Sequence, residues 1–307
     1  MTTGLVAPPG RQGPGPVPGA LVEALDLVLA RRAAGALPGE RRAAGLGTGS
    51  ELAQIRPYQV GDDVRRLDAA ASARTGLPHV REHVPERALT TWLALDVSAS
   101  MAFGTGVRLK ADVAEGVADV VGRLAVRRGG RVGVLTCGAP VTRMLPPRGG
   151  RAALVALRRL LRAGVAPDGV PPAPDALAAA LRRVMRLARG PGLVVVVSDF
   201  REAGAMARPP WARALGALAQ RHEVLAVEVV DARELELPDA GQLSLVDPES
   251  GARLDVDTAS TGLRRAFAAA ELARRDALAA ALRRARARHV ALDADGDWLR
   301  ALGRELR

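Results

Sequence analysis

The stretch that most constrains the fold is an apolar run that ends in one carboxylate and two hydroxyls. It reads Trp92-Leu-Ala-Leu95 and continues as Asp96-Val-Ser98-Ala-Ser100. The length and apolar density of residues 92–95 predict a buried strand of a parallel sheet. The Asp-x-Ser-x-Ser segment then lies where this strand gives way to a loop, which is the edge at which open α/β sheets bind their ligands.

The side chains of this segment favour one class of metal ion. Asp96, Ser98 and Ser100 offer only oxygen ligands. Oxygen ligands suit a hard divalent cation such as Mg²⁺ or Mn²⁺, whereas zinc sites are usually built from histidine and cysteine. The sequence therefore predicts an oxygen-lined metal site at the carboxyl edge of a sheet.

A regular alternation of strands and helices follows from residue 88 onward. Residues 193–197 form a continuous apolar, β-branched run, typical of a strand buried on both faces, and Ser198-Asp199 follows it directly. Further strands are predicted at 131–137, 141–145, 223–230 and 290–292, a hairpin over 242–257, and helices at 107–127, 152–162, 175–188, 211–221, 258–288 and 297–306. This order implies right-handed crossovers and an α/β fold whose mostly parallel sheet carries helices on both faces.

The chain before residue 88 has a different texture. Residues 1–19 are rich in proline and glycine, which predicts a flexible arm without a core. Residues 20–34 carry apolar side chains at helical spacing and predict an amphipathic helix. We therefore predict three parts: an arm over 1–19, the helix with a small α+β module over 20–87, and the sheet domain over 88–307.

The module contains a block dense in charges of both signs, from Arg56 to Arg74. One interpretation is a surface loop whose ion pairs each contribute little stability. The other is a network of paired Asp and Arg side chains that fixes an irregular module. The residues alone leave both open.

Two histidines in the module have the spacing of one class of zinc peptidase, His79-x-x-Glu82-His83. That chemistry requires a helix, on which residues four apart converge on one ion. Pro78 and Pro85 bracket the segment and its residues alternate as in a strand. The two imidazoles of a strand would stand about 13 Å apart at ~3.3 Å per residue, so a shared zinc ion is not expected.

Composition limits the remaining function classes. The net charge of +11 is carried almost wholly by arginine, and Lys110 is the one lysine. The abundance of Ala, Gly, Pro and Arg favours a compositional bias, with arginine-mediated nucleic-acid binding as the alternative. Cys137 is the one cysteine, and no apolar run reaches the ~18–20 residues of a membrane-spanning helix. The protein is expected to be soluble and cytoplasmic.

The charged block and the Asp-x-Ser-x-Ser segment together resemble a known family. The block reads Arg56-Pro-Tyr58-x-x-Gly61-Asp62-Asp63-Val-Arg65-Arg66-Leu-Asp68, then Ser72-Ala-Arg74, and Asp96-x-Ser98-x-Ser100-Met101 follows it. This pattern resembles the domain of unknown function 58 family, whose core is similar to a von Willebrand factor type A domain. We expect the block to form a structural network through Arg56, Tyr58, Gly61, Asp62, Asp63, Arg65, Asp68, Ser72 and Arg74.

The resemblance implies a metal-ion-dependent adhesion site. In such a site Ser98 and Ser100 would bind the ion directly, Asp96 and Asp199 largely through water, and an open position would accept a carboxylate of a partner. Adhesion sites of this kind also use a threonine from a later loop as a ligand, and this chain has Ala173-Pro174-Asp175 at that place. Because proline has no side-chain ligand, Asp168 and Asp175 are the possible substitutes.

The resemblance also implies a function. It points to a non-enzymatic, chaperone-like partner of MoxR-type AAA+ ATPases that acts on an unknown client protein and is expected to bind Mg²⁺ or Mn²⁺ weakly. The residues are consistent with a non-enzymatic role, since the sequence has no P-loop, no Ser/His/Asp arrangement and no cysteine pair. The alternatives are a magnesium-dependent phosphohydrolase with Asp96 as nucleophile and arginine-mediated nucleic-acid binding.

Overall fold

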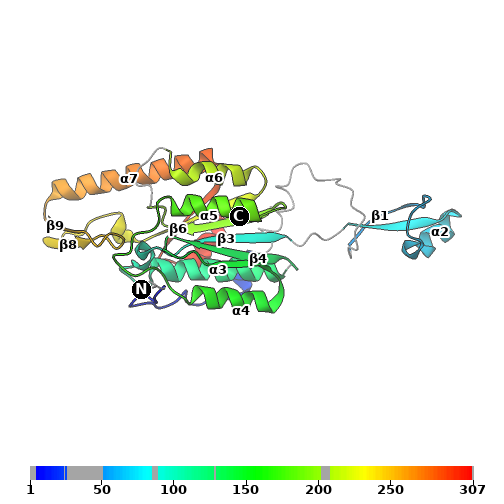
Figure 1. Ribbon diagram of the computed structural model, residues 1–307, viewed down its shortest axis with the longest axis horizontal. Coiled ribbons are helices and arrows are strands. Elements are labelled where there is room, and N and C mark those ends of the chain that lie inside the picture. Colours follow the sequence, from blue (N-terminus) through cyan, green and yellow to red (C-terminus); the bar gives the residue numbers. More distant parts are fainter. Residues whose placement is uncertain are drawn as a thin grey trace. The chain divides into compact units, whose positions relative to one another are not determined.

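The computed structural model describes residues 5–23, 25, 51–84, 89–127, 129–201 and 208–305. The chain divides into two compact units (Figure 1). Unit 1 comprises Met1–Ala36 and Leu89–Arg307, and unit 2 comprises Leu37–Ala88.

Unit 1 is built on a six-stranded sheet with the order β10-β7-β6-β3-β4-β5. All neighbouring pairs are parallel except β4 and β5, which are antiparallel. The strands are β3 (Thr90–Asp96), β4 (Arg131–Cys137), β5 (Met144–Arg148), β6 (Gly192–Ser198), β7 (Glu223–Val230) and β10 (Arg288–Asp293). The predicted α/β fold with a mostly parallel sheet is therefore confirmed.

Helices cover both faces of this sheet, with α3 and α4 on one face and α5, α6 and α7 on the other (Figure 1). They are α3 (Lys110–Arg127), α4 (Gly150–Leu161), α5 (Ala176–Leu187), α6 (Pro210–Ala219), α7 (Thr261–Arg284) and α8 (Trp298–Glu305). Side chains of a strand point alternately to its two faces, so β3 serves two cores. Leu93 and Leu95 join the core under α3, and Trp92 and Ala94 join the core under α5.

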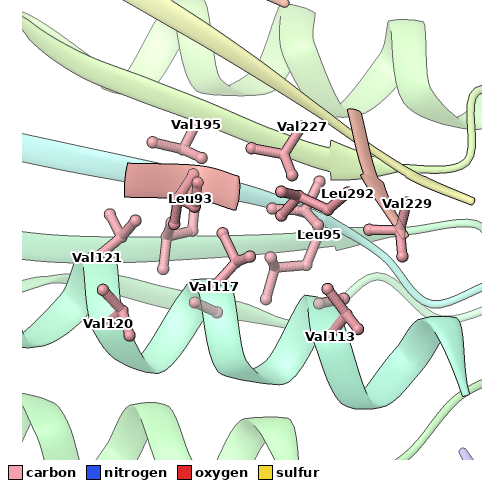
Figure 2. Packing of buried hydrophobic residues seen from close by; sticks show 14 of the residues in the cluster. Leu93, Leu95, Val113, Val117, Val120, Val121, Val195, Val227, Val229 and Leu292 are labelled. Carbon is pink, nitrogen blue, oxygen red and sulfur yellow. The ribbon is translucent and has the colours of Figure 1, made fainter. Parts of the chain in front are cut away.

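The core under α3 holds the central strands in place. Figure 2 shows Leu93 and Leu95 of β3 and Val195 of β6 facing Val113 and Val117 of α3. All five side chains are buried. Burying a valine or leucine side chain contributes about 1.5–3 kcal/mol, so this contact fixes α3 against the middle of the sheet.

Two further predictions can be compared with unit 1. The predicted hairpin is present as β8 (Gln242–Val246) and β9 (Arg253–Asp257). The strand predicted at 141–145 lies three residues later, at β5, and includes Pro146 and Pro147. Prolines donate no amide hydrogen, and β5 tolerates them because it is an edge strand with only one neighbour.

Unit 2 is a small α+β module, as predicted. Strand β1 (Glu51–Pro57) pairs antiparallel with β2 (His79–Val84), and η1 (Val64–Arg66) and α2 (Ala69–Thr75) lie between them in sequence. The segment from His79 to His83 is therefore the predicted strand and not the helix that a zinc peptidase site requires.

The N-terminal segment differs from the predicted flexible arm. Val6 exchanges two backbone hydrogen bonds with Val165, of 2.8 and 2.9 Å. The buried carboxylate of Asp112 accepts hydrogen bonds from Arg11 Nε at 3.0 Å and from the Gly13 amide at 2.9 Å. A composition rich in glycine and proline excludes a core of its own, but it does not exclude a segment held by hydrogen bonds to a neighbouring domain.

The predicted helix after this segment also groups differently. Residues 19–23 and 25 are helical, and Val22 and Leu25 are buried in the core under α3. This part of the chain therefore belongs to unit 1, whereas we predicted it together with the module. Val22 and Leu25 of its apolar stripe pack in the sheet domain, and the rest of the predicted helix lies outside the described residues.

Candidate metal centre

The two predicted carboxylates meet at the middle of the sheet. Asp96 is the last residue of β3, and Asp199 follows the last residue of the neighbouring strand β6. The chain runs outward from β3 to β4 and β5 on one side and from β6 to β7 and β10 on the other. The edge between β3 and β6 is thus the topological switch point, where the connections leave room for a ligand.

The loop after β3 brings the two serines to the same place. Ser98 is the N-cap of η2 (Ala99–Ala102), and its amide donates to Asp96 Oδ1 at 2.9 Å. The hydroxyl oxygens of Ser98 and Ser100 lie 3.1 Å apart, and the Ser100 hydroxyl donates to Asp199 Oδ2 at 2.9 Å. All four predicted site residues therefore form one connected cluster.

A glycine after β4 allows this loop to lie close to its neighbour. Gly138 has a φ of +83°, in the left-handed region that glycine tolerates best. A Cβ at this position would overlap Asp96 Oδ1 and would lie 2.8 Å from both the Cβ and the amide nitrogen of Ser98. Gly138 is thus a residue of the site that the sequence pattern did not reveal.

Ser198 is a second residue that the prediction missed. Its hydroxyl donates to Asp96 Oδ2 at 2.5 Å and accepts the Phe200 amide at 2.9 Å. Both oxygens of Asp96 are therefore engaged, one by the Ser98 amide and one by the Ser198 hydroxyl. The available signal was a hydroxyl directly before Asp199 at the end of a buried strand.

Lys110, at the start of α3, is the third missed residue and changes the electrostatics most. Its side chain is fully buried, with a relative exposure of 0%. Its ammonium lies 2.7 Å from Asp199 Oδ2 and 2.7 Å from Glu234 Oε1. Glu234 belongs to η3 (Ala232–Glu234), the turn that follows β7, and reaches back to the amide of Asp231. The chain's one lysine thus joins two strand ends.

Beyond Glu234 the ion pairs continue through Arg201 and α7 to β7 and β10. We call this set the charge row: Lys110, Glu234, Arg201, Glu271, Arg274, Glu228 and His289. Arg201 lies 3.2 Å from Glu234 and 3.0 Å from Glu271, and Arg274 lies 2.9 Å from Glu271 and 3.3 Å from Glu228. Because desolvation opposes the attraction of buried ion pairs, the row fixes geometry more than it adds stability.

The two carboxylates of the cluster have opposite pKa shifts. Burial and the negative charge of Asp199 raise the pKa of Asp96 above its ordinary value. Burial also acts to raise the pKa of Asp199, but the Lys110 ammonium outweighs it and holds the pKa of Asp199 below its ordinary value. Lys110 therefore compensates Asp199, whereas Asp96 forms no ion pair with any cation in the described part of the chain.

The residues present fit a hard divalent cation. Two neighbouring ligands of an octahedral Mg²⁺ ion, at about 2.1 Å from it, lie about 3.0 Å apart, close to the 3.1 Å between the Ser98 and Ser100 hydroxyl oxygens. Two carboxylates adjoin these hydroxyls. A divalent cation held there would supply a Lewis-acidic centre able to accept an outside carboxylate.

The two possible substitutes for the threonine ligand are both exposed. Asp175 is the N-cap of α5 with a φ of 54°, and its side chain makes no capping hydrogen bond. Neither Asp168 nor Asp175 shares a hydrogen bond with the four-residue cluster in the described part of the chain. Within the described ranges, no three His, Cys, Asp or Glu side chains are grouped so that they could hold a metal ion by themselves.

Unit 2 contains much of the predicted Asp/Arg network. Arg56 binds Asp62 through two hydrogen bonds of 2.7 and 2.8 Å, and the Gln59 amide adds a third at 2.8 Å. The hydrogen bond from Arg56 is the main reason that the pKa of Asp62 is lowered to about 2. Gly61, with a φ of +108°, forms the turn between them.

The second half of this network is centred on Asp68. Its carboxylate accepts the Ala71 amide at 2.8 Å as the N-cap of α2 and Arg81 Nε at 2.6 Å. The Ser72 hydroxyl donates to the Asp68 carbonyl at 2.6 Å and accepts the His79 amide at 2.9 Å. Arg81 is the partner that the sequence pattern missed.

The remaining network residues take smaller parts. Asp63 caps η1 by accepting the Arg65 amide at 3.0 Å, and the Tyr58 amide donates to the Pro78 carbonyl at 2.8 Å. Arg74 is exposed. The interpretation of the block as a structural network is therefore supported for its aspartates, for Arg56 and for Ser72, whereas Tyr58 and Arg65 take part through their backbone.

No helix in the described ranges combines the length and the apolar character that crossing a membrane requires.

Known proteins resemble this chain over most of its length. A family model described as "Protein of unknown function DUF58" matches residues 54–277. Uncharacterized proteins Rv1480 of Mycobacterium tuberculosis and Mb1516 of Mycobacterium bovis are each 40% identical over 283 residues, which is 91% of this chain and 86% of the relative.

Solved structures resemble it more distantly. The conserved hypothetical protein BatB from Bacteroides thetaiotaomicron is 16% identical with a TM-score of 0.41, and the match covers 71% of this chain and 97% of BatB. The VWA domain of SpRpn10 is 12% identical with a TM-score of 0.37, covering 70% of this chain and 93% of that domain.

Proposed function

The chain belongs to the DUF58 family, and from this premise we propose that it is a non-enzymatic protein-interaction module that binds an acidic group of a partner through a divalent cation. One observation carries the proposal. One hydrogen-bonded cluster at the switch point contains Asp96, Ser98 and Ser100 from the end of β3 and Asp199 from the end of β6. Ser100 and Asp199 are 99 residues apart in the sequence.

The chemistry of the cluster supports adhesion. Two of the four side chains are neutral hydroxyls, and one of the two carboxylates already shares its charge with Lys110. A divalent cation held by such a set keeps more of its positive charge than one held by three carboxylates. An outside Glu or Asp side chain is then a favourable further ligand.

The hydrogen bonds of Asp96 argue against the phosphohydrolase alternative. A nucleophilic carboxylate needs an oxygen that can reach the phosphorus atom. Both Asp96 oxygens accept a hydrogen bond from the protein, from the Ser98 amide and from the Ser198 hydroxyl. Ser98 also stands where a general acid would be needed, and a serine hydroxyl is a poor proton donor at neutral pH.

We place the partner among the MoxR-type AAA+ ATPases, with an unknown client protein. Support for this part comes from the family resemblance of the block from Arg56 to Arg74 and of the Asp96 to Ser100 segment. The proposal commits to a cation-dependent contact, which separates it from arginine-mediated binding of nucleic acid. Binding through arginine would weaken steeply with salt and would not require Mg²⁺.

The test combines metal titration and partner capture. Wild type, Ser98→Ala and the control Ser244→Ala, an exposed serine of β8, are titrated with Mg²⁺ and Mn²⁺ and followed by thermal unfolding. The same proteins are used to pull down a MoxR-type ATPase in Mg²⁺ and in EDTA. We expect a metal-dependent rise in Tm and Mg²⁺-dependent capture for wild type and Ser244→Ala, and neither for Ser98→Ala. Capture that EDTA leaves unchanged would contradict the proposal.

A further inference from the structure

The buried ammonium of Lys110 lies directly beside one carboxylate of the four-residue cluster. It is 2.7 Å from Asp199 Oδ2, the same oxygen that accepts the Ser100 hydroxyl at 2.9 Å. Asp199 is itself 3% exposed. The Lys110 ammonium also lies 5.8 Å from the centre of the Phe103 ring, so its surroundings offer protein contacts on several sides.

This arrangement has a direct electrostatic consequence for a divalent cation. A cation bound by the cluster would share Asp199 with a fixed positive charge in a buried, low-dielectric place, where like charges repel strongly. Without Lys110, the buried Asp199 and the half-buried Asp96 would be two neighbouring carboxylates whose charges repel, and that arrangement would favour a metal. Lys110 therefore compensates the charge of Asp199 when no metal is bound, and it also lowers the affinity of the cluster for a divalent cation.

We propose that Lys110 is a specificity-determining residue of the site: its ammonium is a built-in cation that keeps the Asp199 corner assembled without a metal and weakens divalent-cation binding. This inference rests on the proposed function, because it assumes that the cluster is the metal site. It adds that the site is tuned to bind its metal weakly, and that removal of one positive charge tightens it.

The contact to Glu234 extends the inference to a second element. Lys110 pairs with Glu234 Oε1 at 2.7 Å, and Arg201 Nε lies 3.2 Å from the same oxygen. The turn after β7 is therefore held by the same ammonium that neutralises Asp199. Loss of Lys110 should loosen this turn as well as change metal affinity, and the two effects are measurable separately.

The experiment compares Mn²⁺ binding to wild type, Lys110→Met and Arg158→Met. Methionine keeps the length of the lysine side chain and removes its charge. Arg158→Met removes the same unit of charge from the pair between Arg158 and Asp119, 2.9 Å apart and outside the cluster, and controls for net charge. Mn²⁺ affinity is measured from the EPR signal of the free ion, and Tm is measured in EDTA and in Mn²⁺.

We expect Lys110→Met to bind Mn²⁺ at least tenfold more tightly than wild type, to melt at a lower temperature in EDTA and to recover in Mn²⁺, while Arg158→Met keeps the wild-type affinity. If Lys110→Met does not fold, the double variant Lys110→Met/Glu234→Gln, which strands one carboxylate fewer, takes its place.

The outcomes separate this inference from the proposed function. If wild type binds Mn²⁺ and Lys110→Met binds it no more tightly, the role of Lys110 is wrong and the metal site stands. If only Lys110→Met binds, the inference holds and the metal-dependent function of the wild-type protein is wrong. If neither variant nor wild type binds, both are overturned.

Discussion

Replacing Gly138 by alanine should damage the candidate metal centre more than the same change at a matched glycine. Gly138 and Gly129 both have left-handed backbones, with φ of +83° and +69°. A Cβ on Gly129 meets nothing within 4 Å, whereas a Cβ on Gly138 would overlap Asp96 Oδ1 and lie 2.8 Å from the Ser98 Cβ. The left-handed conformation costs an L-residue about 1–2 kcal/mol, and this cost is common to both variants.

The difference between the two variants measures the close approach alone. Overpacking of a well-packed site costs typically about 1–3 kcal/mol. At about 2–4 °C per kcal/mol for a domain of this size, Gly138→Ala should melt about 2–12 °C below Gly129→Ala. Because the added methyl group displaces Asp96 or Ser98, Gly138→Ala should also lose the Mn²⁺-dependent rise in Tm that Gly129→Ala keeps.

Thermal unfolding in EDTA and in Mn²⁺, followed by circular dichroism, tests both expectations. Equal melting temperatures and equal Mn²⁺ responses for the two variants would show that the loop after β4 does not constrain Asp96 and Ser98. The reasoning from the close approach at Gly138 would then be refuted.

Further predictions concern Asp96 and its donor and the Arg56–Asp62 pair. Ser198→Ala removes a donor to the half-buried carboxylate of Asp96 and should lower the free energy of unfolding by about 1–3 kcal/mol in urea titrations, against little change for Ser244→Ala. The pKa of Asp96 is raised in the folded protein, so the metal-free protein should lose stability as pH rises above about 4. Asp96→Asn should flatten this pH dependence in thermal melts from pH 4 to 8. The same variant should also abolish the Mn²⁺-dependent rise in Tm. The pKa of Asp62, lowered to about 2, implies stability of unit 2 that is present at neutral pH and lost between about pH 4 and 2. Arg56→Ala should remove this contribution, seen as faster amide exchange in unit 2, and leave the Mn²⁺ response intact; unchanged exchange would contradict the role of the pair.

The sequence predicted those residues of the site that directly follow a recognisable buried strand. Asp96 and Asp199 each follow a buried apolar run, and parallel strands bring their carboxyl ends to one edge. Position along the chain was therefore enough to place them together, without knowledge of any side-chain contact.

The residues that were missed depend on tertiary contacts. Lys110 meets Glu234 across 124 positions of sequence, and Arg81 meets Asp68 from a neighbouring strand. Periodicity places Lys110 at the start of a helix but cannot say which strand end its ammonium reaches. Its being the one lysine among many arginines was the available signal, and the compositional interpretation of the basic residues obscured it.

The N-terminal segment was missed for a different reason. Composition predicts whether a segment can form its own core, and residues 5–18 form none. What fixes them is a carboxylate of α3, Asp112, together with the Pro14 carbonyl, which accepts Trp298 Nε1 at 2.9 Å. Such hydrogen bonds depend on side chains of the sheet domain, so the amino-acid pattern of the N-terminal segment cannot predict them.

The charge row has a consequence for how this protein can change. Glu271 serves two arginines, and Glu228 serves Arg274 and His289, the latter at 3.0 Å. Replacement of an inner member such as Glu271 leaves the neighbours on both sides with one ion-pair partner fewer, whereas a paired exchange preserves the charge balance. Lineages that alter the inner members of this row should therefore do so in compensated steps.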